Sequence, residues 1–493
     1  MCYPSREEFI DLSKKGNLIP VYRDMLTDFD TPLSCFAKID KGAYSFLLES
    51  VEGGERIARY SFLGSEPSIV FSSKGNKISL LEGKVLKTFT AEDPIDELRK
   101  ILARYKTVKV KGLPRFFGGL VGFFGYDMVR FMEKIPDKNP DQLNVSDSLF
   151  MLTDTILIFD HVDHKLKVVS NAYVKDDPDQ AYDEAVRKID RIVNDLMKPL
   201  EKHLLAFNVK KRSGELKIKS NFDKKSFEEA VTSAKAYIKK GDIIQTVLSQ
   251  RLETPIRSHP FQIYRALRSI NPSPYMYYLK LNDFYLVGSS PEVMVRCEDG
   301  VVELRPIAGT RPRGSSDDED ETLKKDLLAD PKERAEHIML VDLGRNDIGR
   351  VSEYNSVKIP ELMVIEKYSH VMHIVSDVVG KLRRGKDSFD VIRATFPAGT
   401  VTGAPKVRAM EIIDELENTK RGTYAGSVGY FSFSGNLDCC ITIRTILIKD
   451  SKAYIQAGCG IVADSVPERE YMETLNKAKA LVKAIELAEE GLE

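Results

Sequence analysis

The segment 305–313, with sequence RPIAGTRPR, combines arginines with residues that let a ligand approach the backbone. Pro306 restricts the backbone, and Thr310 offers a hydroxyl. Between them, Ala308 and Gly309 leave space beside the chain. Such a turn suits an acidic ligand, because guanidinium groups pair well with carboxylates. The alternative is an arginine-flanked surface turn that binds nothing.

Two further side chains could transfer protons. Glu292 follows a predicted strand, and its carboxyl would lie at a turn where it could serve as a general acid. Glutamates at turns are nevertheless usually just exposed. His373 lies in an apolar, strand-like run, where a hydrogen-bonded core histidine is more common than a catalytic one. The residues alone leave both roles open.

Two helices could each supply a carboxylate to a Mg²⁺ ion. Asp330-Pro-Lys-Glu predicts a helix start, so Glu336 shares a helical face with Leu340 and would be partly buried. Glu473 falls on the polar side of the last helix, where the residues alone favour an ordinary solvated face. Mg²⁺ keeps much of its hydration and needs few protein oxygens, so such a pair could hold it together with a substrate carboxylate.

The elements that must position these side chains fall into two regions. Residues 1–200 alternate short strand-like runs with turns and close on a helix, which predicts a mixed α+β region. Residues 201–222 are basic and weakly periodic, as expected of a linker. Residues 223–493 form the second region and hold every candidate discussed so far.

Local signals place helices and strands in the second region. Ser226-Phe-Glu-Glu has the pattern of a capping box, and the helix predicted from it ends at Gly241. The next run, 243–252, is rich in β-branched residues and predicts a strand that carries Gln245, an unusual side chain in the middle of a strand. Ser465-Val-Pro-Glu predicts the start of the last helix.

Composition excludes several classes of function. A chain of 493 residues with a formal net charge of −1 offers no broad field for nucleic acid or an anionic membrane. The longest apolar stretch, 116–124, is too short to span a bilayer. Six cysteines without a CxxC pair indicate neither a disulfide framework nor a zinc site, and a reducing cytoplasm is the simplest location.

Four ordered motifs resemble those of the chorismate-utilising enzymes: 305–311 (RPIAGTR), 335–347 (AEHIMLVDLGRND), 400–406 (TVTGAPK) and 458–464 (GCGIVAD). Segments 47–50 and 53–64 in turn resemble the large subunits of anthranilate synthases. The resemblance covers nearly the whole chain. It implies an α+β fold in which β-sheets pack as a central sandwich with helices outside, with an N-terminal regulatory region and a C-terminal chorismate-binding region.

The resemblance also implies roles for individual residues. It assigns Mg²⁺ to Glu336 and Glu473, the protonation of a departing hydroxyl to Glu292, and a catalytic role to His373. Cys459 stands where this family usually has alanine. Chorismate would lie against Gly309, Thr310, Tyr424, Arg444, Gly458, Cys459 and Gly460. Because chorismate is a dicarboxylate, Mg²⁺ would hold one carboxylate and Arg444 the other.

Two positions bear on the choice of reaction. Relatives that add water to the ring have a lysine at the position of Gln245, and an amide cannot deprotonate water. Aminodeoxychorismate synthases have a nucleophilic lysine at the position of Ala308, and alanine cannot attack the ring. Neutral ammonia needs neither lysine. We therefore expect amination of chorismate followed by loss of pyruvate, which gives anthranilate.

The resemblance implies two further ligands. No cysteine lies in the Gly-x-Cys-x-Gly elbow of a glutamine amidotransferase, so ammonia would come from a separate glutaminase subunit in a hetero-oligomer. Ser50, Pro274, Tyr275 and Met276 match tryptophan-binding elements and predict feedback inhibition, although they could merely pack between regions. Two alternatives stay open: an aminodeoxychorismate or aminodeoxyisochorismate synthase, which adds ammonia but stops before pyruvate leaves, and a non-catalytic tryptophan sensor or assembly partner.

Overall fold

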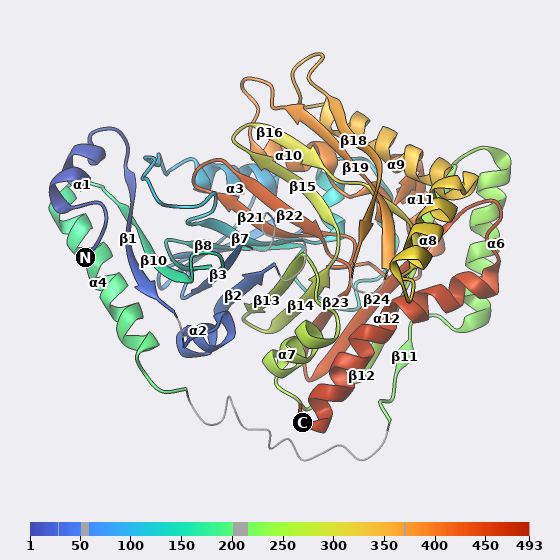
Figure 1. Cartoon of the computed structure of the whole chain (residues 1–493), viewed down its shortest axis with the longest axis horizontal. Coiled ribbons are helices and arrows are strands. Elements are labelled where there is room, and N and C mark those ends of the chain that lie inside the picture. The colour runs from blue at the N-terminus through green and yellow to red at the C-terminus, as the bar shows by residue number, and fades with distance from the viewer. Residues whose placement is uncertain (28, 51–58, 201–214, 369–370, 493) are drawn as a thin grey trace.

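The computed structural model describes residues 1–27, 29–50, 59–200, 215–368 and 371–492, and two large sheets dominate it (Figure 1). The first sheet has 12 strands. In spatial order they are β1 (Leu18–Leu26), β10 (Lys165–Tyr173), β9 (Thr155–Asp160), β3 (Tyr60–Ser65), β2 (Tyr44–Glu49), β13 (Tyr275–Leu281), β14 (Phe284–Ser290), β23 (Thr445–Lys449), β24 (Lys452–Ile461), β12 (Gln245–Pro255) and β11 (Lys219–Ser220), with β20 (Gly403–Ala404) also paired to β12.

The second sheet also has 12 strands. Their order is β17 (Ile307–Pro312), β19 (Val371–Lys381), β16 (Val301–Leu304), β15 (Val293–Glu298), β22 (Leu437–Ile441), β21 (Ser427–Ser432), β7 (Gly119–Phe124), β8 (Ser148–Thr153), β4 (Ile69–Lys74), β5 (Lys77–Glu82) and β6 (Val85–Thr90), with β18 (Lys358–Lys367) paired to β19. The α+β architecture expected from the resemblance is confirmed.

Alternation along the strands builds the core. On β13, Tyr277 and Leu279 face a buried cluster that also contains Phe150 of β8 and Phe431 of β21, so this cluster lies between the sheets. The intervening Tyr278 faces the opposite side, where it packs with side chains from helices. The first sheet is therefore covered by the second sheet on one face and by helices on the other.

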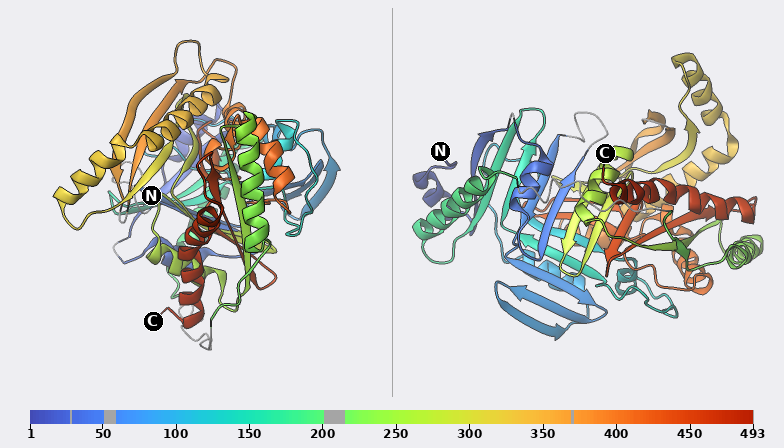
Figure 2. Two further views of the ribbon diagram at one scale, coloured as in Figure 1. Left: turned by 90° about the vertical axis from the view of Figure 1, so that its right-hand side faces the viewer. Right: turned by 90° about the horizontal axis from the view of Figure 1, so that it is seen from below.

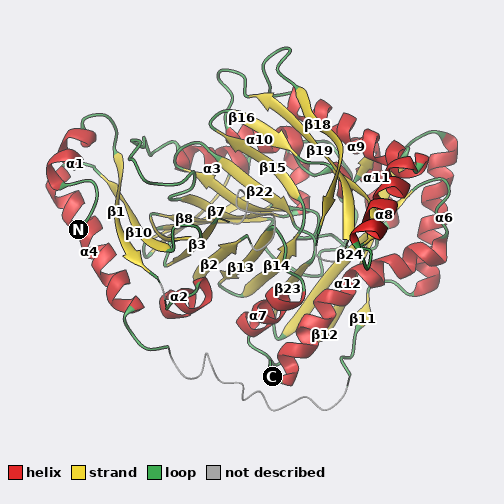
Figure 3. Ribbon diagram, viewed as in Figure 1, coloured by secondary structure: helices red, strands yellow, loops and turns green. Residues whose placement is uncertain are grey.

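The helices lie outside the sandwich, as Figures 2 and 3 show. They are α1 (Arg6–Ser13), α2 (Pro32–Ile39), α3 (Pro94–Leu102), α4 (Pro178–Leu196), α6 (Lys224–Lys240), α7 (Pro260–Ile270), α8 (Asp317–Ala329), α9 (Pro331–Gly349), α10 (Ser388–Thr395), α11 (Lys406–Leu416) and α12 (Pro467–Glu490), with the short 3₁₀ helices η1 (Tyr126–Phe131) and η2 (Gly399–Val401). Within the described ranges, none of these helices combines the length and apolar character needed to cross a membrane.

The predicted helix starts are partly confirmed. Asp330 caps α9, with its carboxylate accepting the backbone N–H of Lys332, and Gly241 ends α6 in a left-handed conformation. The predicted start at Ser226 is wrong, because Asp223 accepts the N–H of Ser226 and begins α6 earlier. The start predicted from Ser465 is also wrong by one residue: its hydroxyl accepts the N–H of Val462, and α12 has no side-chain cap.

Both sheets combine strands from the two predicted regions. In the first sheet, β2 pairs with β13, placing Leu47 opposite Tyr278. In the second, β7 pairs with β21, placing Gly122 opposite Gly429. The boundaries at 200 and 223 stay a prediction. Of the predicted linker, 201–214 lie outside the described residues, whereas Lys219–Ser220 form β11 and pair with β12.

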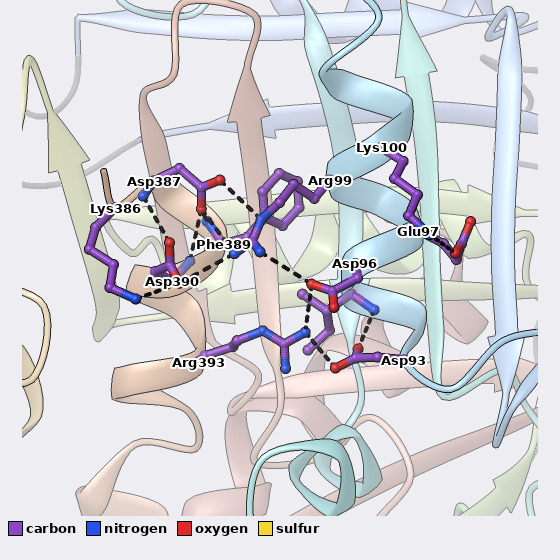
Figure 4. Close-up of polar contacts among 11 residues, drawn as sticks. Asp93, Asp96, Glu97, Arg99, Lys100, Lys386, Asp387, Phe389, Asp390 and Arg393 are labelled. Atoms are coloured by element: carbon purple, nitrogen blue, oxygen red, sulfur yellow. Dashed lines mark hydrogen bonds and ion pairs between the residues drawn. The ribbon is translucent and has the colours of Figure 1, made fainter. Parts of the chain in front are cut away.

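A group of ion pairs joins α3 of the N-terminal region to α10 of the C-terminal region (Figure 4). The Arg99 guanidinium lies 3.0 Å from a carboxylate oxygen of Asp387 and over the ring of Phe389. In the opposite direction, Arg393 pairs with Asp93 and, at 3.1 Å, with Asp96. Each helix therefore contributes both cations and anions to this contact.

Candidate active site

A cavity of about 710 Å³ lies in the C-terminal region. Its walls come from the two sheets, α9, α12 and the turn around η2. The residues predicted to bind chorismate, to hold a metal ion or to take part in catalysis line this cavity, except Cys459. They are Gln245, Glu292, Gly309, Thr310, Glu336, His373, Tyr424, Arg444, Gly458, Gly460 and Glu473.

Three glycines keep the cavity open. Gly309 has φ +70° at a bulge in β17, a conformation that side chains rarely adopt. A Cβ on Gly458 would lie 2.6 Å from the Tyr424 hydroxyl oxygen, and a Cβ on Gly460 would lie 2.7 Å from Nε2 of Gln245. A side chain at position 458 would therefore crowd Tyr424 and the backbone of Leu248, and one at position 460 would displace the Gln245 amide.

Glu292 has the environment of a carboxylic acid that keeps its proton. It follows β14, and its backbone carbonyl accepts the N–H of Ile441 at 3.0 Å, which fixes the turn. Burial raises the pKa of Glu292 to about 7, while the Thr400 hydroxyl and the Lys477 ammonium act in the opposite direction. This carboxyl can therefore donate a proton near neutral pH, which an exposed turn glutamate could not.

His373 on β19 is oriented by backbone. Its Nδ1 lies 2.9 Å from the carbonyl oxygen of Gly309 and 3.1 Å from the Thr310 hydroxyl. A carbonyl only accepts, so Nδ1 carries the proton in this contact and Nε2 keeps its lone pair. Burial lowers the pKa of His373, which favours the neutral ring. His373 is thus a candidate base rather than only a core residue.

Carboxylates from α9 and α12 meet at the cavity. Glu333 and Glu336 lie one turn apart on α9, and Glu470 and Glu473 lie one turn apart on α12; all four line the cavity. Burial raises the pKa of Glu336, and the negative charges of Glu333 and Glu473 add to the shift. A bound cation would relieve this repulsion.

The donor set suits Mg²⁺. Within the described ranges, no three metal-ligating side chains converge on one point, so a cation between Glu336 and Glu473 would complete its shell with water and substrate oxygens. Mg²⁺ is typically bound in this way, through one or two carboxylates and several waters.

Cations line the same cavity. Burial lowers the pKa of Arg444, whose guanidinium donates to the carbonyl oxygen of Lys477 at 2.6 Å. Lys477 itself donates to the carbonyl oxygen of Gly458 at 3.0 Å and pairs with Glu473 at 2.7 Å. Arg444 and Lys477 give the cavity positive charge beside the carboxylate pair, as a dicarboxylate ligand would require.

The family model described as chorismate binding enzyme matches residues 44–483. The chain belongs to the chorismate binding enzymes. It is similar over its whole length to anthranilate synthase component 1 of Acetivibrio thermocellus, at 51% identity over 99% of this chain and 100% of that protein. The same protein of Aquifex aeolicus is 50% identical over 99% of both chains.

Solved structures of chorismate binding enzymes agree. Anthranilate synthase component I from Streptococcus pneumoniae superposes with a TM-score of 0.77 at 38% identity, covering 86% of this chain and 92% of that one. The menaquinone-specific isochorismate synthase of Escherichia coli superposes with a TM-score of 0.70 over 98% of this chain. At 19% identity, the latter shows the shared fold alone.

The two positions that bear on the choice of reaction both face the cavity. Gln245 is buried at the start of β12, and its Oε1 has no hydrogen-bond partner among the described residues. Ala308 lines the cavity from β17. Gln245 and Ala308, the two positions at which other chorismate binding enzymes are expected to have lysines, therefore line the same cavity.

Cys459 departs from the expected arrangement. Its Sγ lies 3.8 Å from the carbonyl oxygen of Leu248 and near the Glu470 carboxylate, it packs in a cluster with Phe227, and Cys459 does not line the cavity. Alternation along the strand explains this, because Gly458 and Gly460 face the cavity. The Cys459 thiol cannot contact a ligand there, and only its backbone remains available for substrate binding.

Other cavity residues were not predicted from the sequence. Glu470 and Lys477 lie beside Glu473 on the polar side of the last helix, where the sequence favours a solvated face, and the sequence predicts for Glu333 only a capping role. The available signal was spacing: 470, 473 and 477 recur on one side of a helix, as do 333 and 336. Without a partner surface, that pattern equally describes exposure to water.

A second cavity, of about 250 Å³, contains all four residues predicted to bind tryptophan: Ser50, Pro274, Tyr275 and Met276. The Tyr275 hydroxyl donates to Asp438 at 2.8 Å, and Arg296 donates to the same hydroxyl oxygen at 3.1 Å. The hydroxyl of Ser50 is buried and has no partner among the described residues. Residues 53–58 of the segment 53–64, which resembles anthranilate synthase large subunits, lie outside the described residues.

Proposed function

We propose that the chain is the large component of an anthranilate synthase, which converts chorismate and ammonia to anthranilate, pyruvate and water, the first step of tryptophan biosynthesis. The observation that carries the proposal is the near-50% identity to anthranilate synthase components 1 over the full chain. Two features of the cavity support the proposal. Glu292 has a raised pKa and can act as an acid, and neither position 245 nor position 308 is a lysine.

The chain's own groups account for the amination. Arg444 pairs with one carboxylate of chorismate and excludes water around it. Glu292 donates its proton to the ring hydroxyl, which leaves as water while the nitrogen of ammonia bonds to the ring. Gln245 Oε1, which lacks a partner in the described structure, can accept a hydrogen bond from the incoming ammonia.

The second half of the reaction uses His373. Its Nε2 accepts the proton from the aminated ring carbon, the bond to the enolpyruvyl oxygen breaks, and the leaving group takes up a proton as pyruvate. The ring thereby becomes aromatic, which drives the step forward.

Mg²⁺ belongs to this proposal as the cofactor. Glu336 and Glu473 would hold it, and the bound ion would neutralise the ring carboxylate of chorismate as the reaction proceeds. Burial and the nearby negative charges of Glu333 and Glu473 raise the pKa of Glu336, which supports a cation beside it.

A separate glutaminase would supply the ammonia. The relatives carry the designation component 1, which implies a second component. The proposed assembly is a hetero-oligomer of the two. All six cysteines are free thiols, which supports placing the reaction in the reducing cytoplasm.

Tryptophan is the proposed inhibitor and the smaller cavity its site. One segment connects the two cavities: Asn271 and Ser273 line the larger, whereas Pro274 and Met276 line the smaller. Asn271 donates to Ser289 at 2.7 Å, only three residues before Glu292. Occupation of the smaller cavity can therefore displace groups near the acid.

The test is incubation with chorismate, Mg²⁺ and ammonium at alkaline pH, with anthranilate fluorescence and pyruvate measured together. Equal amounts of both support the proposal. An amino-substituted chorismate without pyruvate would instead indicate an aminodeoxychorismate or aminodeoxyisochorismate synthase. Binding of tryptophan without turnover would indicate a sensor that has kept the fold. The control omits ammonium and should produce no anthranilate.

A further inference from the structure

A buried ion pair lies directly behind the wall of the larger cavity. Arg421 and Glu417 have side-chain exposures of 1% and 4% and are joined by two hydrogen bonds, of 2.7 Å and 3.0 Å. Glu417 also accepts the N–H and the hydroxyl of Ser249. Neither member of the pair lines the cavity. A buried ion pair is weak evidence of stabilisation, because desolvation opposes the attraction.

The remaining donors of Arg421 reach two walls of the cavity. Its Nη1 donates to the carbonyl oxygen of Val401 at 2.8 Å, and its Nη2 donates to that of Val247 at 2.7 Å. Val401 follows Thr400, and both line the cavity together with Glu292. Val247 lies two residues beyond Gln245 on the same face of β12, and both line the cavity.

Arg421 also contacts Tyr424, which forms a third wall of the cavity. The Arg421 guanidinium carbon lies 5.5 Å from the centre of the Tyr424 ring and 4.8 Å from that of Tyr126. The Tyr424 hydroxyl in turn points toward Gly458. One rigid, planar group therefore contacts the supports of the acid, of the amide and of a substrate-binding ring.

We propose that Arg421 is a positioning residue that sets the distance between the acid side and the nucleophile side of the cavity. The inference rests on the proposed function. It acts through Val401, Val247 and Tyr424 and makes no contact with substrate. A flexible ammonium could not replace it, because the fork of the guanidinium fixes two carbonyls and an ion pair at once.

Arg251 provides a matched control. It is buried in the same part of the core and donates to the carbonyl oxygen of Lys420 at 3.2 Å, the residue before Arg421. Its other donations go to Gln142 and Thr419. None of these groups lines the larger cavity. Substitution of Arg251 therefore perturbs the same loop without touching the walls.

The experiment compares Arg421→Lys with Arg251→Lys in the full chain. We expect Arg421→Lys to lower kcat about 100-fold, the effect of misplacing reacting groups by about 1 Å. The KM for chorismate should rise far less than kcat falls, because Tyr424 is held by Arg421 but Arg444 and the glutamates of α9 and α12 are not. Arg251→Lys should reduce the melting temperature comparably and leave kcat within about threefold. Equal losses of kcat in both variants would overturn the inference.

A double-mutant cycle gives a second readout. If Arg421 acts through the 399–401 turn, Thr400→Val combined with Arg421→Lys should lower kcat less than the product of the single effects. Full multiplicativity would contradict the proposed path. If Arg421→Lys does not fold, Glu417→Gln loosens the same guanidinium with nearly unchanged volume and carries the same expectations.

A crystal structure of the variant tests the inference independently of the reaction product. The carbonyl of Val401 and the ring of Tyr424 should shift, while α9 and α12 stay in place. Unchanged positions of both would refute the positioning role. Failure of the wild-type chain to make anthranilate would refute the proposed function and leave this structural comparison to decide on Arg421.

Discussion

The two cavities differ in where their walls come from. The larger is lined only by residues between 245 and 481, whereas the smaller combines residues 48–50, 59, 60, 62, 114 and 115 with residues of the C-terminal region. The smaller cavity exists because β2 pairs with β13 in a fixed register that places Leu47 opposite Tyr278. Chemistry can thus be contained in one region, while a site for a regulator depends on how both regions assemble.

Their charges are also arranged differently. In the smaller cavity Asp438 is satisfied by the Tyr275 hydroxyl and lies 3.4 Å from the guanidinium of Arg296. In the larger cavity burial raises the pKa of Glu292, Glu336 and Glu470. In the smaller cavity the charged side chains pair with one another. In the larger cavity the buried carboxyl groups can bind a proton or a cation. Substitutions should therefore separate catalysis from regulation.

The largest effect should come from Glu292→Gln. Loss of the acid should lower kcat about 1,000-fold while chorismate binding is retained, since Arg444 is untouched. With the concentration of neutral ammonia held constant, the wild-type rate should fall as pH rises through about 7, where Glu292 loses its proton. Stopped assays with ammonium across pH test both expectations. A variant with more than a tenth of the wild-type kcat would exclude Glu292 as the acid.

The same substitution should change stability in a pH-dependent way. In the unfolded chain the carboxyl loses its proton near pH 4.5, but in the folded protein only near 7, so the wild type loses stability as pH rises through this window. The loss is of the order of 3 kcal/mol. Urea unfolding at pH 4.5 and pH 8 should show a smaller decrease for Glu292→Gln. Equal decreases would contradict the raised pKa.

Removal of a metal ligand should have the next largest effect. Glu336→Gln should lower activity about 100-fold and weaken the dependence on Mg²⁺, because the cation site loses one of two carboxylates. Added Mg²⁺ should raise the melting temperature of the wild type and not of the variant. Asp342→Asn, an exposed carboxylate further along α9, is the control and should respond as the wild type does. A normal Mg²⁺ response in Glu336→Gln would place the ion elsewhere.

The smaller cavity should respond in the opposite way. Ser50→Phe fills space beside Tyr275 and Met276, so tryptophan should inhibit at least about tenfold more weakly while uninhibited kcat stays unchanged. Inhibition curves with and without the substitution measure this. If inhibition is unchanged, tryptophan does not bind there; if kcat falls as well, the two cavities are not separable.

The α+β class was predicted from the sequence and is confirmed, but the pairing of strands around the larger cavity was not predicted. Glycine at 309 is favoured by its positive φ, and glycine at 458 by the Tyr424 hydroxyl that faces it. Such local requirements determine the residue type, so they can be recognised in the sequence. The pairing of β2 with β13 leaves no such local signal, because it joins segments over 200 residues apart. Arg421 was missed for a related reason: its partners Val401 and Val247 offer only backbone carbonyls.

The smallest effect should come from the ion pairs between α3 and α10. Arg393→Gln removes the contacts with Asp93 and Asp96, which are partly exposed, so it should lower the free energy of unfolding by about 1 kcal/mol or less. The difference should shrink at high salt, because solvent screens such pairs. Lys100→Gln is the control: Lys100 pairs with Glu97 within α3 and joins no second helix (Figure 4). Urea unfolding at low and high salt compares the two variants.

The same variant also tests the separation of the two cavities. Helix α10 leads into the turn that carries Thr400. A loss of kcat in Arg393→Gln would therefore show that the N-terminal region also supports the acid side of the larger cavity, so that the two cavities are not fully separate.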